Sequence, residues 1–399
     1  MAIQFAIVGS GAFGLATALH LTKLGYNDIV CFDKETVPSP VAAANDSNKV
    51  VDWLCHEIND QISSADRVAA EAMEMWQKDE FYNRFYHQRG MVVSASKTES
   101  LAVLEKHANI HKIHEFLETP ADFRRHIPVL DGPLENWKGY VMEPEDGWVH
   151  SRDCIKALAN LLERRNVKFV SGDDGDITKV VEKDGAVGYL ESVSGKRYKA
   201  ANYIVCAGAG VTRIIDLEDQ VQSRCWSVAH IKVSEEEASQ FNGLPLLMNL
   251  NEGYYFEPDE NDTVKVVWEF PGFVNFESDH VSVPDYTVPA NSAPGETQIR
   301  RFLRNALPSL ADRPFESRKL CWCAMTADRQ LLICRHPHLA NLTVASGDSY
   351  ISFRLTPVIG QYIAAVAIKG NQGLNIQDRK TWEWRPGLKF TDKPIDLPR

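Results

Sequence analysis

Three glycines near the N-terminus have the spacing of a phosphate-binding turn. Residues 9–14 are G-S-G-A-F-G, so Gly9, Gly11 and Gly14 follow the pattern G-x-G-x-x-G directly after an apolar run. In such a turn the first glycine permits the bend, the second lets a pyrophosphate approach the backbone, and the third lets helix and strand pack closely. The N-terminus of the helix that follows attracts a phosphate, because its N–H groups are free and the helix dipole is positive there. We therefore expect a dinucleotide to bind at this turn.

An acidic residue follows the glycines at the sequence separation that is typical of a dinucleotide-binding domain. A second apolar run, Ile29–Phe32, ends in Asp33, 19 positions beyond Gly14. An acidic residue about 20 positions after the glycines accepts hydrogen bonds from a ribose 2′-OH. A free 2′-OH disfavours NADP, and on these residues NAD and FAD both stay open.

Two further groups of residues could take part in chemistry. Residues 46–49 (D-S-N-K) form a polar cluster in a loop rich in Pro, Ala and Asn. In a dinucleotide-binding domain, loops at the carboxyl ends of the strands face the ligand. Cys321 and Cys323 form a C-x-C pattern, and alternation along a strand would point both thiols the same way. No second cysteine pair or histidine cluster has zinc spacing, so we expect no metal site.

The pattern of apolar residues predicts the elements that position these groups. Residues 5–8 and 29–32 predict buried strands, with a helix over 13–24 between them. Residues 203–210 predict another buried strand ending in small residues, which implies that the N-terminal strand has sequence-distant neighbours. From about 226 to 276 the pattern changes to alternating β segments, as in the antiparallel wall of a substrate domain.

The predicted fold class is α/β (α+β overall), with a Rossmann-type nucleotide-binding domain interleaved with a substrate domain built on a mainly antiparallel β-sheet. We expect the nucleotide-binding domain to be discontinuous and to comprise residues 1–85, 145–220 and 320–375. The substrate domain would comprise residues 86–144 and 221–319, and residues 376–399 would form a C-terminal tail.

Composition excludes several classes of function. The chain has 399 residues, and its net charge of −11 argues against nucleic acid or an anionic membrane as the main partner. No run approaches the ~20 apolar residues that span a bilayer. The sequence enters its first strand without a signal-peptide pattern and ends in D-L-P-R rather than the peroxisomal S-K-L, so a cytoplasmic enzyme is expected.

Several stretches, in order over more than 350 residues, resemble the fungal amadoriases (fructosyl amino acid oxidases), members of the sarcosine oxidase group of FAD-dependent amine oxidases. These stretches are G-S-G-A-F-G at 9–14, N-D-S-N-K at 45–49, F-E-P-D-E to E-F-P-G-F at 256–273, L-C-W-C-A-M-T-A-D-R at 320–329, A-S-G-D-S to P-V-I-G at 345–360, and W-E-W-R-P-G at 382–387. The resemblance implies that FAD, not NAD, is the cofactor.

The resemblance also implies a role for individual residues. Cys321 would carry the FAD covalently as an 8α-S-cysteinyl adduct. Lys265 would lie close to the flavin and assist its reoxidation, because a cation stabilises superoxide as it forms. Glu269 would contact the substrate, and Lys49 would lie over the opposite region of the flavin and assist substrate binding. Arg354 replaces a substrate-contacting lysine of the family, and an arginine can grip a carboxylate bidentately.

Other residues are expected to surround the two ligands. The expected cofactor-binding residues are Gly9, Ser10, Gly11, Ala12, Phe13, Gly14, Asp33, Lys34, Asn48, Lys49, Ile177, Ala207, Gly208, Asp348, Ser352, Phe353, Arg354 and Leu355. The expected substrate-pocket residues are Asp60, Tyr255, Cys323, Tyr350, Ile351 and Arg385. Tyr350 and Ile351 stand where the family has Gly-His, and Glu383 stands where an arginine is common. These departures argue against an ordinary fructosyl amino acid as substrate.

The activity implied is oxidation of the C–N bond of a secondary amine, an N-substituted amino acid, to an imine, with O₂ reduced to H₂O₂. One alternative is oxidative ring closure on an N-methyl aromatic amino acid in fungal secondary metabolism, with Asp52, His56 or Asp60 as the base. A second alternative is a flavin-binding module without turnover, although Lys265 and Cys321 speak against it. The expected partners are a small amine and O₂, without nucleic acid or membrane, and the chain is expected to be a monomer.

Overall fold

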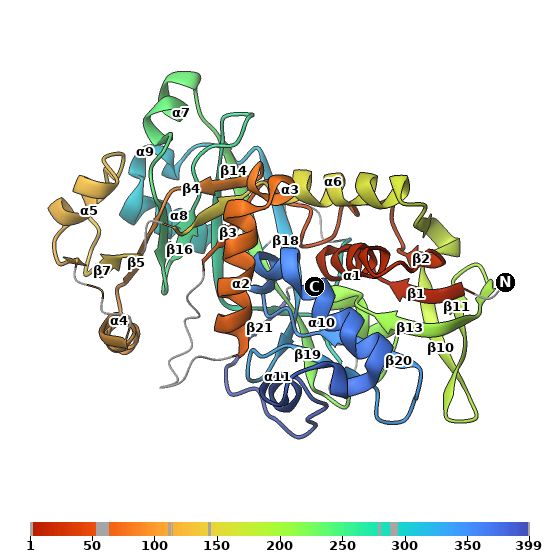
Figure 1. Ribbon diagram of the computed structural model, residues 1–399. Coiled ribbons are helices and arrows are strands. Elements are labelled where there is room, and N and C mark those ends of the chain that lie inside the picture. The colour runs from red at the N-terminus through yellow and green to blue at the C-terminus, as the bar shows by residue number, and fades with distance from the viewer. Residues whose placement is uncertain are drawn as a thin grey trace.

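The computed structural model describes residues 3–52, 64–110, 113, 115–142, 145–277, 281–287 and 294–397, without the side chains of residues 110, 269 and 270. Two large sheets dominate this part of the chain (Figure 1). None of the helices described is long and apolar enough to cross a membrane. The mixture of helices and sheets confirms the α/β fold class that the sequence predicts.

A six-stranded sheet is built around the N-terminal strand. In spatial order its strands are β19 (Leu332–Arg335), β20 (Leu342–Ser346), β13 (Ala200–Val205), β1 (Ile3–Val8), β2 (Ile29–Phe32) and β9 (Lys168–Val170). β1 pairs in parallel with β2 on one side and with β13 on the other. The predicted sequence-distant neighbour of the first strand is therefore confirmed.

Two helices pack against each other beside this sheet. They are α1 (Ala12–Lys23), which follows the glycine turn, and α10 (Thr356–Lys369) near the C-terminus. A Cβ at Gly360 would lie 2.0 Å from the carbonyl oxygen of Ala16, so only glycine lets the helices approach so closely. This contact holds α10 against the helix that follows the glycine turn.

The second large sheet is mainly antiparallel, as predicted. Its strands, in spatial order, are β18 (Ser317–Thr326), β14 (Val221–Lys232), β17 (Thr263–Val274), β16 (Gly253–Tyr255), β15 (Leu246–Asn249), β5 (Met91–Ala95), β7 (Lys138–Val141) and β6 (Phe116–Leu117), and β21 (Ile395–Asp396) pairs with β17. β18 remains in this sheet as far as Thr326, six residues beyond the boundary expected at 320. The predicted domain boundaries stay predictions.

The remaining described elements connect and cover the large sheets. Two small sheets consist of β3 (Lys49–Val51), β8 (Gly147–Val149) and β4 (Tyr86–Gln88), and of β10 (Ile177–Lys183), β11 (Ala186–Ser192) and β12 (Arg197–Tyr198). The other described α-helices are α2 (Ser64–Lys78), α3 (Glu80–Asn83), α4 (Thr98–Ile110), α5 (Pro120–His126), α6 (Ser151–Arg164), α7 (Glu235–Phe241), α8 (Glu296–Ala306), α9 (Pro308–Ala311) and α11 (Ile376–Thr381).

Candidate active site

The glycine turn between β1 and α1 has the geometry of a phosphate cradle. Gly9 has a φ of +101°, and a Cβ there would lie 2.3 Å from the carbonyl oxygen of Cys206. A Cβ at Gly14 would lie 1.9 Å from the carbonyl oxygen of Gly9, whereas a Cβ at Gly11 would meet no atom within 4 Å. Gly9 and Gly14 therefore allow close packing of the protein backbone, whereas Gly11 leaves room for a ligand.

Asp33 is fixed beside this turn. Its Oδ2 accepts a hydrogen bond of 2.8 Å from the backbone N–H of Ser10, and its Oδ1 accepts one of 3.2 Å from that of Glu35. Burial raises the pKa of Asp33, and the two hydrogen bonds offset part of that effect. The carboxylate is thus held where a ribose hydroxyl would meet it.

A cavity of about 370 Å³, the nucleotide cavity, extends from this turn. Of the predicted cofactor-binding residues it is lined by Gly9, Gly11, Ala12, Phe13, Asp33, Lys34, Lys49, Ile177, Ala207, Gly208, Asp348, Ser352 and Phe353. The hydroxyl of Ser346, also on its wall, is buried and has no hydrogen-bond partner among the described residues. A cradle of glycines, the carboxylate of Asp33 and a polar group left unsatisfied together fit a dinucleotide such as FAD.

The other predicted cofactor-binding residues lie behind this wall. Ser10 and Gly14 belong to the turn itself, and Leu355 packs in the core beside α1 and α10. The carbonyl oxygen of Asn48 accepts a hydrogen bond of 2.7 Å from Lys265 Nζ. These residues shape the cavity without lining it.

An adjoining cavity of about 350 Å³ is lined largely by strands β14 to β18 of the mainly antiparallel sheet. Lys49, Cys323, Tyr350 and Phe353 line both cavities. Cys321, Lys265, Trp226, Tyr254 and Ile351 line the adjoining cavity. The predicted catalytic lysines and thiols therefore meet where the two cavities adjoin.

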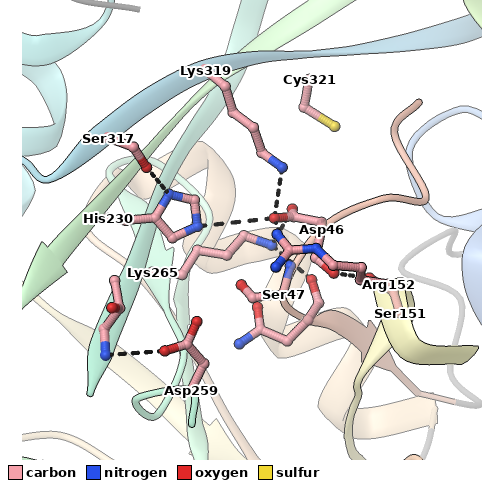
Figure 2. A network of polar contacts seen from close by, with 12 residues as sticks. Asp46, Ser47, Ser151, Arg152, His230, Asp259, Lys265, Ser317, Lys319 and Cys321 are labelled. Carbon is pink, nitrogen blue, oxygen red and sulfur yellow. Dashed lines mark hydrogen bonds and ion pairs between the residues drawn. The ribbon is translucent and has the colours of Figure 1, made fainter. Parts of the chain in front are cut away.

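A buried carboxylate, Asp46, connects the lysines of this region (Figure 2). Its Oδ2 lies 2.7 Å from Lys265 Nζ and 3.3 Å from Lys49 Nζ, and its Oδ1 lies 2.8 Å from Lys319 Nζ. His230 Nε2 lies 3.9 Å from the same Oδ1. We call these five residues the Asp46 cluster.

Burial and the charges within the Asp46 cluster shift the pKa values of its members. Burial opposes the charge of Asp46, but Lys265, Lys319 and Lys49 together hold its pKa well below the usual range. Burial lowers the pKa of Lys265 to about 8, against the opposing effect of Asp46. Burial likewise lowers the pKa of His230 to about 4. Asp46 is thus a fixed negative charge that keeps a buried cation beside the cavity.

Alternation along β18 accounts for the arrangement around the thiols. Each of these side chains stands two residues from the next along the strand: Lys319, Cys321 and Cys323. They therefore share one face of the sheet, and both thiols line the adjoining cavity, as the sequence predicts. Lys49 Nζ lies 3.6 Å from Cys321 Sγ. A hydrogen bond from Cys323, and then the charge of Lys49, lower the pKa of Cys321 below its usual value against the effect of burial. The surroundings of Cys321 therefore favour its thiolate form.

Tyr254, not the predicted Tyr255, faces the adjoining cavity. Tyr254 pairs with Val267 across β16 and β17, and Tyr255 pairs with Val266. Residues that pair across strands point to the same face, so Tyr254 shares the face of Val267 and Lys265. Tyr255 lies on the opposite face, buried in the core.

Two predicted substrate-binding arginines line neither cavity. Arg354 makes a buried ion pair with Asp52, and its Nη1 also donates a hydrogen bond of 3.2 Å to the carbonyl oxygen of Asp52. Arg385 pairs with Asp328, with contacts of 2.8 and 3.0 Å. Asp52 itself lines the adjoining cavity. Asp60, His56 and the side chain of Glu269 lie outside the described part of the chain.

Several residues of the site are not among those that the sequence predicts. Asp46 belongs to the polar cluster that the sequence singles out, but nothing local distinguishes it from a solvated loop residue. Lys319 could have been found from its spacing to Cys321, since residues two apart on a strand share a face. Trp226 and Arg329, which also line the adjoining cavity, carry no such signal.

Comparison with known proteins assigns this architecture to a class. Residues 4–366 match the DAO family, described as FAD dependent oxidoreductase, and the chain belongs to this family. The protein is therefore an FAD-dependent oxidoreductase, which confirms FAD over NAD.

Individual relatives refine the class. The L-saccharopine oxidase of Schizosaccharomyces pombe is 30% identical over 420 residues, which cover 98% of this chain and 95% of that protein. The crystal structure of amadoriase II, a fructosamine oxidase of Aspergillus fumigatus, matches with a TM-score of 0.92 and 31% identity over 100% of this chain and 94% of that one. A monomeric sarcosine oxidase of Bacillus sp. (strain NS-129) is 24% identical over 380 residues, covering 91% and 92% of the two chains. The predicted resemblance to amadoriases and sarcosine oxidases is confirmed.

Proposed function

We propose that the protein oxidises the C–N bond of a secondary amine, an N-substituted amino acid, to an imine, with O₂ reduced to H₂O₂. The observation that carries this proposal is the meeting of the two cavities at Lys49 and Cys323, with Lys265 and Cys321 beside them. A small substrate in the adjoining cavity would lie against a cofactor that begins at the glycine turn. The amadoriases and sarcosine oxidases named above favour turnover over a non-catalytic flavin module.

The residues around the nucleotide cavity would hold FAD. Gly11 would admit the pyrophosphate and Asp33 would accept the ribose hydroxyls. FAD, when bound, supplies the electron acceptor for the amine and the donor for O₂. We further propose that Cys321 holds it as an 8α-S-cysteinyl adduct. The nearby Lys49 ammonium supports this role, because the thiolate is the reactive form of cysteine.

Lys265 would supply positive charge where O₂ is reduced. Its ammonium is buried on the wall of the adjoining cavity and is held by Asp46 and by the carbonyl oxygen of Asn48. A cation fixed in advance stabilises the negative charge that develops on oxygen without a cost of reorganisation. Asp46 acts as a positioning residue for this lysine.

The substrate class follows from the cavity and from the relatives. A secondary amine must be neutral to give up a hydride, so activity should rise with pH as the substrate loses its proton. Lys49 offers a cation for a substrate carboxylate, and Tyr350 and Ile351 make the wall less polar than a sugar adduct would need. The relatives act on L-saccharopine and on fructosamines, according to their names. We favour an N-substituted amino acid of the saccharopine kind over a sugar adduct.

Peroxide release on a panel of amines tests the proposal. The panel contains L-saccharopine, fructosyl-glycine, fructosyl-lysine and N-methyl-tyrosine, assayed with the purified full-length holoenzyme. We expect peroxide with L-saccharopine at a kcat/KM at least about tenfold above that with the fructosyl compounds, the factor that one lost polar contact produces. A preference for the fructosyl compounds would overturn the substrate class, and a lack of peroxide with every secondary amine would overturn the activity.

A further inference from the structure

Residues 281–287, which we call the 281–287 segment, form part of the wall of the nucleotide cavity. Two side chains of this segment, Pro284 and Tyr286, line the cavity. The segment falls in the part of the sequence that is expected to form the substrate domain, and neither residue is among the predicted cofactor-binding residues. The wall of the cavity therefore includes a stretch of chain that the glycine motif does not predict.

The main chain of the 281–287 segment is fixed to the mainly antiparallel sheet. Ser282 is 1% exposed, and its Oγ donates a hydrogen bond of 2.6 Å to the carbonyl oxygen of Ser223 in β14. Trp322 Nε1, in β18, donates a hydrogen bond of 3.0 Å to the carbonyl oxygen of Asp285. These two bonds hold the segment on either side of Pro284, so its place at the cavity is part of the fold.

Tyr286 meets a lysine that comes from the other large sheet. Lys34 Nζ lies 3.9 Å from the centroid of the Tyr286 ring, within the range of a cation–π interaction. Lys34 follows Asp33 in the loop after β2, and both of these residues line the nucleotide cavity as well. The contact between Lys34 and Tyr286 therefore connects the two large sheets at the wall of this cavity.

Tyr286 is near both ends of the site proposed for FAD. Asp33, which would accept the ribose hydroxyls, directly precedes Lys34. Cys321, the thiol proposed to hold the flavin, directly precedes Trp322, whose indole holds the main chain beside Tyr286. Burial, and then the charges of Cys321 and Asp33, raise the pKa of Tyr286, in keeping with this position.

The environment of Tyr286 is suited to a ring that covers a ligand. The side chain is only partly buried, so apolar surface remains that a ligand in the cavity would remove from water. Lys34 holds the ring, so a ligand does not bear the entropy cost of ordering it. Such a residue should slow the departure of the ligand that it covers.

We propose that Tyr286, held by Lys34, is a binding residue that retains FAD in the nucleotide cavity. This retention does not need a covalent link at Cys321, and it concerns the cofactor rather than the amine that is oxidised. When FAD leaves, the surface that the ring covers returns to water, and this cost slows the release.

Release of FAD from the Cys321→Ala holoenzyme tests this inference, because that variant has no thiol at residue 321 to attach the flavin. The fluorescence of FAD rises when it leaves the protein, so dilution into buffer without FAD gives the rate constant of release. We expect Tyr286→Ala to raise this rate constant by about 10- to 100-fold, the factor that burial of one aromatic side chain provides. Tyr286→Phe keeps the ring and should stay within about threefold. An unchanged rate constant in Tyr286→Ala would overturn the inference.

Thermal unfolding separates retention of FAD from a purely structural role of the ring. A residue that binds the cofactor changes the rise of the Tm on addition of FAD, whereas a residue that only stabilises the fold lowers the Tm equally with and without FAD. Val281→Ala is the matched control, because its side chain belongs to the same segment but does not line the cavity. Equal losses of Tm with and without FAD in Tyr286→Ala, or release from Val281→Ala that is as fast, would overturn the inference.

A double-mutant cycle tests the part assigned to Lys34. Lys34→Met should speed the release of FAD by about 3- to 10-fold, because the ring loses its cation. If the lysine acts through the ring, the same change made in Tyr286→Leu should add less than about twofold. Factors that multiply in the double variant would show that Lys34 binds FAD by itself, and they would overturn its role in holding Tyr286.

These measurements need no amine, so their outcome is distinct from that of the proposed activity. Fast release from Tyr286→Ala together with no peroxide from any amine would support the inference and overturn the activity alone. If acid precipitation frees the FAD of the wild type, the same release assay applies to the wild-type holoenzyme and to the same variants made in it. A Cys321→Ala protein that binds no FAD even in excess would show that the wall retains nothing without the covalent link, and it would overturn the inference.

Discussion

Replacing Lys265 by methionine removes the charge at the centre of the site with little change in side-chain volume. The ammonium of Lys265 lies 2.7 Å from Asp46 and 2.7 Å from the carbonyl oxygen of Asn48. After the change Asp46 still has Lys49 at 3.3 Å and Lys319 at 2.8 Å. Because the buried carboxylate keeps two cations, we expect the loss in free energy of unfolding to stay at about 1–3 kcal/mol.

The expected effect on the reaction with O₂ is much larger than that on stability. One unit charge stabilises another at about 4 Å by about 4 kcal/mol when the effective dielectric constant is about 20. Since about 1.4 kcal/mol corresponds to a factor of ten, loss of the ammonium should slow formation of superoxide by up to about 10³-fold. Reduction of the cofactor by the amine would place no charge on oxygen, so its rate constant should fall by less than about tenfold.

Stopped-flow measurements separate the two steps. Enzyme is first reduced by the amine without O₂, which gives the rate constant of reduction, and is then mixed with O₂, which gives the second-order rate constant of reoxidation. Lys319→Met is the matched control, because Lys319 binds the same carboxylate but lines neither cavity. Equal losses in both rate constants of Lys265→Met, or a loss in the control as large as in Lys265→Met, would refute the electrostatic role.

Three other predictions follow from the site. The pKa of Lys265, lowered by burial to about 8, means that its charge is present below that pH and is lost above it, so the reoxidation rate constant should fall as pH rises through about 8; a constant that rises with pH would contradict this. Protein precipitated by acid should stay yellow and Cys321→Ala should give a colourless pellet; a colourless wild-type pellet would exclude covalent attachment. Gly14→Ala should destabilise the fold by more than about 3 kcal/mol, because its Cβ would overlap the carbonyl oxygen of Gly9, whereas Gly11→Ala should leave the apoprotein within about 0.5 kcal/mol and weaken FAD retention. Equal Tm losses for the two alanine variants would contradict this assignment of the glycines.

The parts of the fold that the sequence predicts are those in which local pattern decides the structure. The apolar runs 5–8 and 29–32 are buried strands, and the glycines between them form the turn that their spacing requires. The alternating residues from 226 to 276 lie in a mainly antiparallel sheet. In each case the side-chain period of the element is visible within a few residues.

The strand face of a residue is predictable only when the register is known. The sequence placed Tyr255 in the pocket, but its neighbour Tyr254 faces the cavity because it pairs with Val267, on the same face as Lys265. A shift by one residue moves a side chain to the other side of a sheet. Conversely, Cys321 and Cys323 were predicted to point the same way, because the spacing within one strand needs no partner.

Charge partners depend on contacts that no local pattern encodes. Asp46 meets Lys265 and Lys319 across more than 200 residues, and Asp52 meets Arg354 across 302. The sequence predicted a cation at 354 that grips a substrate carboxylate, whereas the structure pairs this cation with an aspartate from another element. Once paired, Arg354 has its charge balanced by Asp52, so it does not offer a substrate the free cation that the sequence predicted. Whether a charged side chain is available to a ligand is therefore a property of the tertiary structure, because it depends on the partner that the fold brings to that side chain.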